Sequence, residues 1–218
     1  LTFPVETFNI LVENGKYKDE ETADFIAEMW SLGHSFFCYQ SDSVDALASC
    51  CRLRNEVESN VFSYTLGAGG VKTGSKCVVT MNLNRIIQNW DRAGRVVTLD
   101  KEIETITTRI HAYLDAWNKK LWDDFNDGLL SVYSAGFIDL DKQFLTVGVN
   151  GFVEAAEYLK IKTDPFNEEY KQLARDILGT IKRVNKEHRT KHCRFNTEMI
   201  PAENAAGKLY NWDKKDGY

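Results

Sequence analysis

Apolar residues along the chain fall into short strand-like runs separated by helical stripes. Runs rich in β-branched and aromatic residues are typical of strands, and they occur at 3–12, 35–41, 77–83, 143–149 and 194–200. Between these runs, apolar residues recur every three or four positions, which is the spacing of an amphipathic helix. The longest stripe predicts a helix over about 100–130, with Asp100 as its N-cap. Shorter helices are expected from Glu21 to near Gly33, from Arg85 to near Gly94, and over 152–159, 167–190 and the residues after Pro201.

The order of these elements, with helices between successive strands, is typical of an α/β fold with parallel strands. It fits part of a barrel or an open doubly wound sheet, in which the loops after the strands carry the site. Residues 42–60 lack a regular period and are predicted to form a loop, as is the glycine-rich segment 63–76. A strand rather than a helix follows that segment, so it does not fit a phosphate-binding loop. No repeat and no clear internal boundary are visible.

Composition and charge narrow the function classes. A net charge of −5 over 218 residues argues against a dedicated nucleic-acid binder, because such proteins carry a basic face. No apolar run is long enough for a membrane span, and the first residues do not resemble a signal peptide. The chain begins with Leu1 rather than Met, and we interpret it as a processed or excised piece of a longer protein. The five cysteines lack a CxxC spacing, so we expect a reducing cytoplasm and neither a disulfide scaffold nor a closed zinc site.

Two adjacent cysteines, Cys50 and Cys51, stand in front of Arg52 and Arg54. One interpretation is that they are small core residues, since free cysteine is often buried. The other is a reactive sulfur on a polar loop, because arginines that point at a thiol lower its pKa. The residues alone leave both interpretations open.

Two further pairs of side chains have the right chemistry for a site. His188 and His192 are spaced to share a helix face and could bind a metal, although a solvated basic helix end is favoured. Glu198 and Glu203 could act as an acid–base pair. A helix cap or an ion pair with arginine is the more common role for such carboxylates.

Five segments of the chain, taken together, carry a recognisable order of motifs. They are LTFPVETFNI, GHSFFCYQSDSVDALASCCRLRN, TGSKCVVTMNLNRI, FLTVGVNGFVEAAEYL and FNTEMIPAENAA. In this order they resemble anaerobic (class III) ribonucleoside-triphosphate reductases. The most specific parts are the Cys51-Arg52 pair, NLNR at 82–85 and FNTEMIPAEN at 195–204.

The resemblance implies that residues 1–218 are part of a ten-stranded α/β barrel with a finger loop inside it. In that family a cysteine at the loop tip becomes a thiyl radical, takes the 3′ hydrogen of a ribonucleotide and so allows the 2′ hydroxyl to leave as water. The Cys-Arg match assigns this role to Cys51, while Cys50 either packs or helps to return electrons. The other possibility is a non-catalytic barrel fragment, or a nucleotide-binding or assembly module that needs a partner chain.

The resemblance also implies cofactors and partners. Formate-using members carry an asparagine where this chain has Ser75 or Lys76, so a dithiol protein competes with formate as the reductant. The ATP-binding domain, the glycyl-radical motif and its zinc site are not in this sequence, so no metal is expected here. We expect as partners a reductase polypeptide with the glycyl-radical domain, a radical-SAM activating enzyme and a second copy of the complete enzyme. Ala202 and Glu203, at a predicted helix start, either line the triphosphate site or form an ordinary cap.

Overall fold

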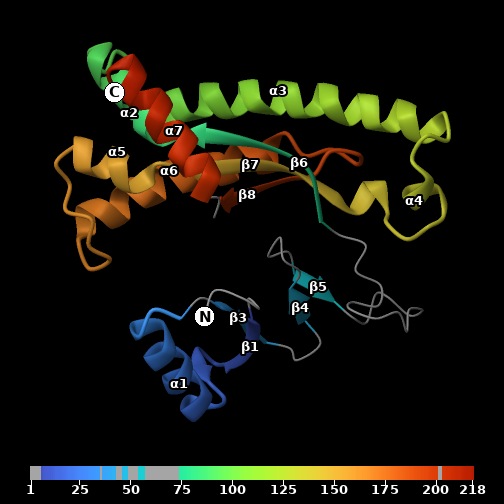
Figure 1. Cartoon of the computed structure of the whole chain (residues 1–218), viewed down its shortest axis with the longest axis horizontal. Helices are drawn as coiled ribbons and strands as arrows, with labels where there is room; N and C mark the ends of the chain where they lie inside the picture. The colour runs from blue at the N-terminus through green and yellow to red at the C-terminus, as the bar shows by residue number, and fades with distance from the viewer. Residues whose placement is uncertain (1–5, 35, 43–45, 49–53, 57–73, 201–202) are drawn as a thin grey trace. The chain divides into compact units, whose positions relative to one another are not determined.

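The computed structural model describes residues 6–34, 36–42, 46–48, 54–56, 74–200 and 203–218. The chain divides into two compact units, Leu1–Gly74 and Ser75–Tyr218 (Figure 1). The sequence shows no boundary at this point, because hydrophobic periodicity reports local elements and not the contacts between them. Each unit is described by itself.

The first unit is built on a strand–helix–strand crossover, as the sequence predicts. Its central strand, β1, pairs in parallel with β3 and in antiparallel with the short β2. The helix α1 makes the crossover, and Asp19 caps it by accepting a hydrogen bond from the Thr22 amide at 3.0 Å. Gly33 follows the C-cap in the left-handed conformation, with φ of 82°, which glycine adopts at little cost. The bounds are β1 Glu6–Glu13, β2 Lys16–Tyr17, α1 Glu20–Ser31 and β3 Phe36–Ser41.

A small hairpin lies within the stretch that the sequence predicts to be a loop. Strands β4 (Ala46–Ala48) and β5 (Arg54–Glu56) pair in antiparallel, with Leu47 opposite Asn55. The loop prediction for 42–60 was therefore wrong at these two strands. Strands of three residues are too short to show an alternating pattern, which explains the error.

The second unit contains a three-stranded sheet in the order β6-β7-β8. Strand β7 pairs in parallel with β8, and Leu145 lies opposite Phe195. Strand β6 runs in the same direction as β7, because Ser75 contacts Thr146 near its start and Asn82 approaches Gly151 at its end. This parallel sheet confirms the predicted α/β class. The bounds are β6 Gly74–Asn82, β7 Gln143–Asn150 and β8 Phe195–Met199.

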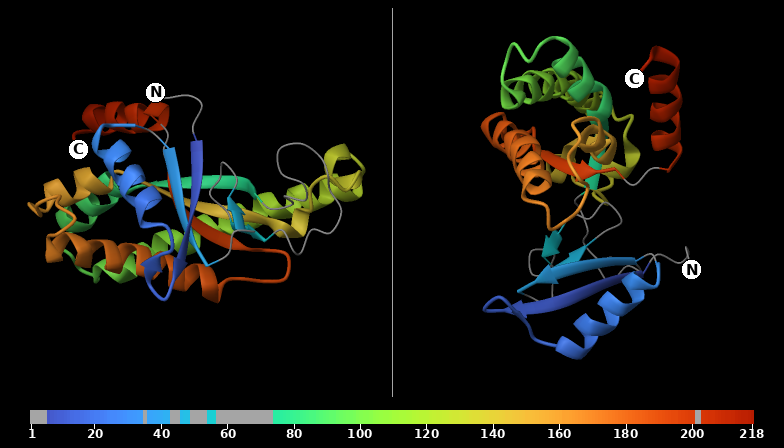
Figure 2. Two further views of the ribbon diagram at one scale, coloured as in Figure 1. Left: turned by 90° about the horizontal axis from the view of Figure 1, so that it is seen from below. Right: turned by 90° about the vertical axis from the view of Figure 1, so that its left-hand side faces the viewer.

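Helices cover this sheet, and α3 and α6 pack against each other beside it (Figure 2). The N-cap of α3 is Thr98 rather than Asp100; Asp100 lies in the first turn, where the helix dipole favours a carboxylate. The short elements α4 and η2 show no periodic signal and were not predicted. The bounds are α2 Leu83–Arg92, α3 Leu99–Asn126, α4 Ser131–Ser134, η2 Leu140–Lys142, α5 Phe152–Tyr158, α6 Glu168–Glu187 and α7 Glu203–Asp216.

Strand β7 separates two chemically different faces of the sheet. Leu145, Val147 and Val149 are fully buried in the core that the helices form on one face. Burying one such side chain stabilises the fold by about 1.5–3 kcal/mol. The alternate residues Thr146 and Gly148 point to the opposite face, because successive side chains of a strand alternate. That opposite face is polar, and it carries the candidate site described below.

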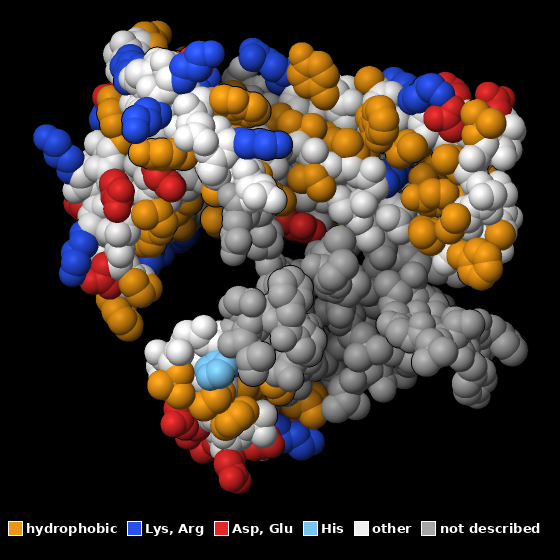
Figure 3. Space-filling view, viewed as in Figure 1, with side chains coloured by type: hydrophobic (Ala, Val, Ile, Leu, Met, Phe, Trp, Pro, Cys, Tyr) orange, Lys and Arg blue, Asp and Glu red, His pale blue; other side chains and the backbone are white. Residues whose placement is uncertain are grey.

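Part of the surface of the second unit is apolar. Figure 3 shows apolar side chains gathered around α4, where Leu129, Val132 and Phe137 are exposed.

In the described parts of the chain, no helix is both long enough and apolar enough to cross a membrane.

Candidate functional site

The predicted site residues are distributed unevenly over the structure. Cys50, Cys51 and Ala202 lie outside the described residues. Glu203 is the first described residue of α7, and Pro201, where the sequence predicts the helix to start, lies outside the described residues. Ser75 lies near the start of β6, and its side-chain contacts are described next.

Ser75 begins a row of hydrogen bonds that crosses the sheet on its polar face. Its Oγ lies 2.7 Å from Oγ1 of Thr146. The Thr146 hydroxyl donates to Oδ1 of Asn196 at 2.7 Å, and Nδ2 of Asn196 donates to Oε1 of Glu198 at 3.0 Å. We call these four residues the Ser75–Glu198 chain. It connects β6, β7 and β8 in turn.

The Ser75–Glu198 chain has one direction from Thr146 onward. A hydroxyl carries a single proton, and Thr146 directs its proton to Asn196. The Ser75 hydroxyl lies within hydrogen-bonding distance of Oγ1 of Thr146 and, at 3.2 Å, of the Cys77 carbonyl oxygen, and these two acceptors share its one proton. Thr146 is fully buried and therefore needs both Ser75 and Asn196 as partners, because an unpaired buried hydroxyl is costly. The links from Thr146 to Asn196 and from Asn196 to Glu198 both point toward the carboxyl group of Glu198.

Among the four residues of the Ser75–Glu198 chain, Glu198 is the one whose side chain can carry out proton transfer. Its Oε1 accepts from Asn196, and that bond leaves Oε2 to accept a proton from another group. A carboxylate fixed by a neighbouring amide is a suitable general base or acid. The sequence indicated Glu198 as a candidate but paired it with Glu203, whereas the structure links it to Asn196, Thr146 and Ser75. Thr146 and Asn196 lie in two of the segments that carry the family resemblance, but the sequence alone did not indicate that their side chains meet.

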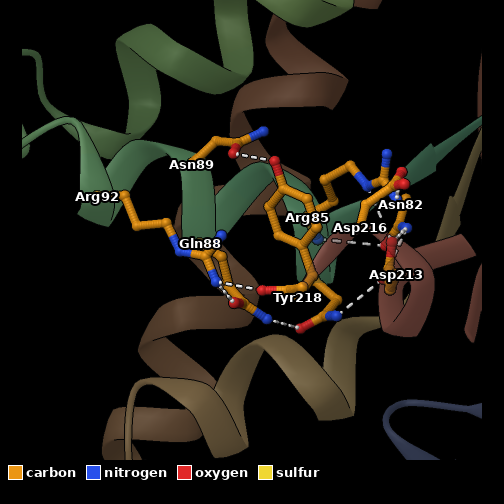
Figure 4. Close-up of polar contacts among 10 residues, drawn as sticks. Asn82, Arg85, Gln88, Asn89, Arg92, Asp213, Asp216 and Tyr218 are labelled. Carbon is orange, nitrogen blue, oxygen red and sulfur yellow. Dashed lines mark hydrogen bonds and ion pairs between the residues drawn. The ribbon is translucent and has the colours of Figure 1, made fainter.

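The polar side chains of the NLNR segment at 82–85 form a second polar cluster with residues of α7. The carboxylate of Asp213 on α7 accepts hydrogen bonds of 2.9 Å from Asn82, Asn84 and Arg85 (Figure 4). A second carboxylate, Asp216, lies 2.9 Å from the Arg85 guanidinium. Burial alone would raise the pKa of Asp213, but these hydrogen bonds and the Arg85 charge outweigh it and hold the pKa below its usual value.

This cluster fixes α7 against α2. The ring of Tyr218 lies 4.6 Å from the guanidinium groups of both Arg85 and Arg92. Its hydroxyl donates to Asn89 at 2.6 Å. The helix that begins at Glu203 is therefore held at its far end by the residues 82–85. The sequence indicated that this segment matters, but it contained no sign that Asp213 is its partner.

The two histidines predicted to share a helix face do not do so. Helix α6 ends at Glu187, so His188 is its C-cap and His192 lies in the following loop. Nδ1 of His188 contacts Nδ1 of the buried His111 at 2.8 Å, while His192 contacts Asp141 at 2.8 Å. Burial lowers the pKa of His111, and this outweighs its bond to Asn185. Across the part of the chain that the structure describes, no three His, Cys, Asp or Glu side chains are grouped to hold a metal ion.

Comparison with known proteins connects this geometry to a family. The family model for anaerobic ribonucleoside-triphosphate reductase matches residues 1–218. The chain belongs to this family. The match includes the Cys51 and Ser75 positions and both polar clusters, and it confirms the resemblance drawn from the five sequence segments.

Solved structures of anaerobic ribonucleotide reductases resemble the chain over nearly its whole length. One, from Thermotoga maritima in complex with dATP and CTP, is 30% identical with a TM-score of 0.71 and covers 99% of this chain and 35% of that one. Another, from the same organism with citrate in the active site, is 29% identical with a TM-score of 0.69 and covers 98% of this chain and 38% of that one. The search of curated proteins found no match. The chain is thus a portion of an anaerobic ribonucleotide reductase and spans little more than a third of the length of these relatives.

Proposed function

We propose that this chain forms part of the ten-stranded catalytic barrel of a reductase that converts ribonucleoside triphosphates to 2′-deoxyribonucleotides by thiyl-radical chemistry. The family match over residues 1–218 is the observation that carries this proposal. The Thermotoga maritima relative in complex with dATP and CTP supports a ribonucleoside triphosphate as the substrate. The same match disfavours the alternative of a non-catalytic fragment or assembly module.

The radical step is assigned to Cys51. Its thiyl sulfur takes the hydrogen atom from C3′, so that an S–H bond forms as the C–H bond breaks. The glycyl radical, on a segment of the reductase outside this chain, supplies the oxidation that generates the thiyl. The 2′ hydroxyl then leaves as water. The overall conversion consumes two electrons and two protons from the reductant, and Cys50 is a candidate to help deliver them.

Glu198 is assigned the proton transfer at the ribose hydroxyls. Its bond from Asn196 fixes the carboxylate, and Thr146 and Ser75 fix Asn196 in turn. Residues that act through another side chain in this way are positioning residues, and their loss should perturb catalysis less than the loss of Glu198 itself.

Ser75 also bears on the choice of reductant. Its hydroxyl already bonds within the protein, to Thr146 at 2.7 Å and to the Cys77 carbonyl oxygen at 3.2 Å, and is therefore a poor donor for a bound formate. A formate carboxylate needs such donors, because it carries a full negative charge. This supports a dithiol protein as the reductant in place of formate.

The triphosphate is assigned to the start of α7. Free backbone amides and the helix dipole favour an anion at a helix N-terminus, and Ala202 and Glu203 are the residues predicted there. The contacts of Asp213 hold this helix in place. The remaining partners are the polypeptide with the glycyl-radical domain, its radical-SAM activating enzyme and a second copy of the complete enzyme.

The decisive experiment is an anaerobic assay of CTP reduction by the activated, full-length reductase. We expect Cys51→Ser to abolish dCTP formation, because oxygen in place of sulfur cannot form a thiyl radical. Cys50→Ser removes the neighbouring sulfur: retained turnover would limit Cys50 to packing, and lost turnover would support its role in delivering electrons. Turnover by the Cys51→Ser variant would reject the assignment.

The same assay tests Glu198. We expect Glu198→Gln to lower kcat by roughly 10²–10⁴-fold, the usual contribution of a general acid or base, with little change in KM. Glu169→Gln, on the exposed side of α6, is the control and should leave kcat unchanged. An unchanged kcat in Glu198→Gln would limit this residue to a structural role.

A further inference from the structure

A cavity of about 580 Å³ lies between α6 and β8, with three cationic side chains on its wall. These are Lys182, Lys186 and Arg189, and no Asp or Glu lines the cavity. Helix α6 contacts β8 along this side (Figure 2). Leu178 and Phe195 contribute apolar surface to the same cavity. We call this space the α6–β8 cavity.

The other cations of α6 are paired with carboxylates. Lys171 lies 2.8 Å from Glu168, and Arg183 lies 2.7 Å from Glu104. Lys182, Lys186 and Arg189 differ, since none of them forms an ion pair with any residue that the structure describes. The cations without a counter-charge are therefore the ones that face the cavity.

Two of these residues share one face of the helix. Lys182 and Lys186 stand at positions i and i+4 of α6, with about 6 Å of helix rise between them. Arg189 lies two residues beyond the end of α6 at Glu187 and lines the same cavity. Like charges this close repel one another unless an anion lies between them. A row of several linked anionic groups matches this arrangement better than a single small anion does.

The wall of the cavity is fixed before any ligand binds. Nδ2 of Asn185 on α6 donates to Oγ1 of Thr197 on β8 at 2.8 Å. Oδ1 of the same Asn185 contacts Nε2 of the buried His111 at 2.7 Å. The first bond joins α6 to β8 and the second joins α6 to α3, so a ligand would not have to order these elements.

We propose that the α6–β8 cavity binds a polyphosphate group, carried by a nucleotide or free. The lysines and the arginine contact the phosphates, because charge-assisted bonds to phosphate are the strong ones. A nucleoside, where present, lies on the apolar surface of Leu178 and Phe195. Asn196 lines this cavity and also belongs to the Ser75–Glu198 chain, but the polyphosphate proposal does not depend on the reductase activity proposed above.

Residue-specific lysine labelling of the full-length protein, read by mass spectrometry, tests this proposal. We expect tripolyphosphate at about 1 mM, a weak-binding concentration, to slow labelling of Lys182 and Lys186 several-fold. Lys160, exposed and outside the cavity, is the internal control and should label at the same rate throughout. Protection by ATP but not by tripolyphosphate would identify a nucleotide, and equal protection by both would identify the phosphates alone; adenosine should protect neither lysine.

Two results would overturn the proposal. One is unchanged labelling of Lys182 and Lys186 with both ligands, in which case the cations only complement the C-terminal dipole of α6. The other is failure of the two lysines to label without ligand, which would show that another part of the full-length protein fills the cavity. As a second variant, Arg189→Ala should weaken the protection at least several-fold, whereas Arg175→Ala, on the paired side of α6, should not.

Discussion

At the scale of single residues, Thr146 connects the two halves of the Ser75–Glu198 chain. Its buried hydroxyl hydrogen-bonds with that of Ser75 and donates to Asn196. Valine has the same shape but can do neither. The sequence displays Thr146 as one β-branched residue in a strand, and nothing in its neighbours indicates these partners.

We expect Thr146→Val to lower the free energy of unfolding by about 1–3 kcal/mol, because it leaves buried polar partners unsatisfied. Urea unfolding of the purified protein measures this. Thr146→Ser keeps the hydroxyl and should recover much of the loss. A Thr146→Val variant as stable as the unmodified protein would show that the hydrogen bonds of the Ser75–Glu198 chain do not contribute to stability.

Asp213 makes a pH-dependent contribution to stability. Its pKa in the folded protein lies below the value of 3.8 for an unperturbed aspartate. Such a group stabilises the fold while ionised, so its contribution is complete above the pKa of the unfolded chain and is lost as the pH falls through the folded pKa.

We therefore expect Asp213→Asn to destabilise the protein at pH 7 by about 1.5–3 kcal/mol, the range for hydrogen bonds to a charged group. The difference from the unmodified protein should shrink as the pH is lowered below about 4. Thermal unfolding over a pH series measures both effects. Asp123→Asn, on the surface of α3, serves as the control, and a pH-independent difference for Asp213→Asn would contradict the pKa argument.

At the scale of elements, the strands and long helices follow from the hydrophobic pattern. Strand β7 was predicted at 143–149 and spans Gln143–Asn150. Short elements without a full period, such as the β4–β5 hairpin, could not be predicted. The end of α6 was predicted three residues too late, because the charged residues after Glu187 continue a helical composition without helical packing.

Two glycines on different elements provide a matched pair of substitutions. A Cβ at Gly148 in β7 would lie 2.6 Å from Oγ1 of Thr80 and 2.7 Å from Cγ1 of Ile200. We expect Gly148→Ala to lower the free energy of unfolding by about 1–3 kcal/mol, the usual cost of overpacking.

Gly179 in α6 is the opposite case, since a Cβ there meets nothing within 4 Å. We expect Gly179→Ala to raise the free energy of unfolding by about 0.5–1 kcal/mol, because alanine restricts the unfolded chain and favours the helix. Chemical denaturation of the two variants side by side measures both. Equal effects of the same sign would contradict the packing described for β7.

At the scale of the whole molecule, the chain spans 35% to 38% of the reductase chains from Thermotoga maritima. We expect the chain alone to give no dCTP from CTP, and turnover to appear with a polypeptide that carries the glycyl-radical domain and with the activating enzyme. Product formation by the chain alone would contradict the proposed division of the machinery. Native mass of the isolated material shows whether such a polypeptide is bound.

The sequence by itself determined the α/β class, the main strands and helices, and the family, because periodicity and motif order are local properties of the chain. The tertiary structure decided which side chains meet. Ser75 and Thr146 are separated by 71 residues, Thr146 and Asn196 by 50, and Asn82 and Asp213 by 131. No local pattern encodes such pairs, because they arise only when parallel strands align side by side and α7 packs against α2. The chemistry of the Ser75–Glu198 chain is therefore a property of the folded sheet.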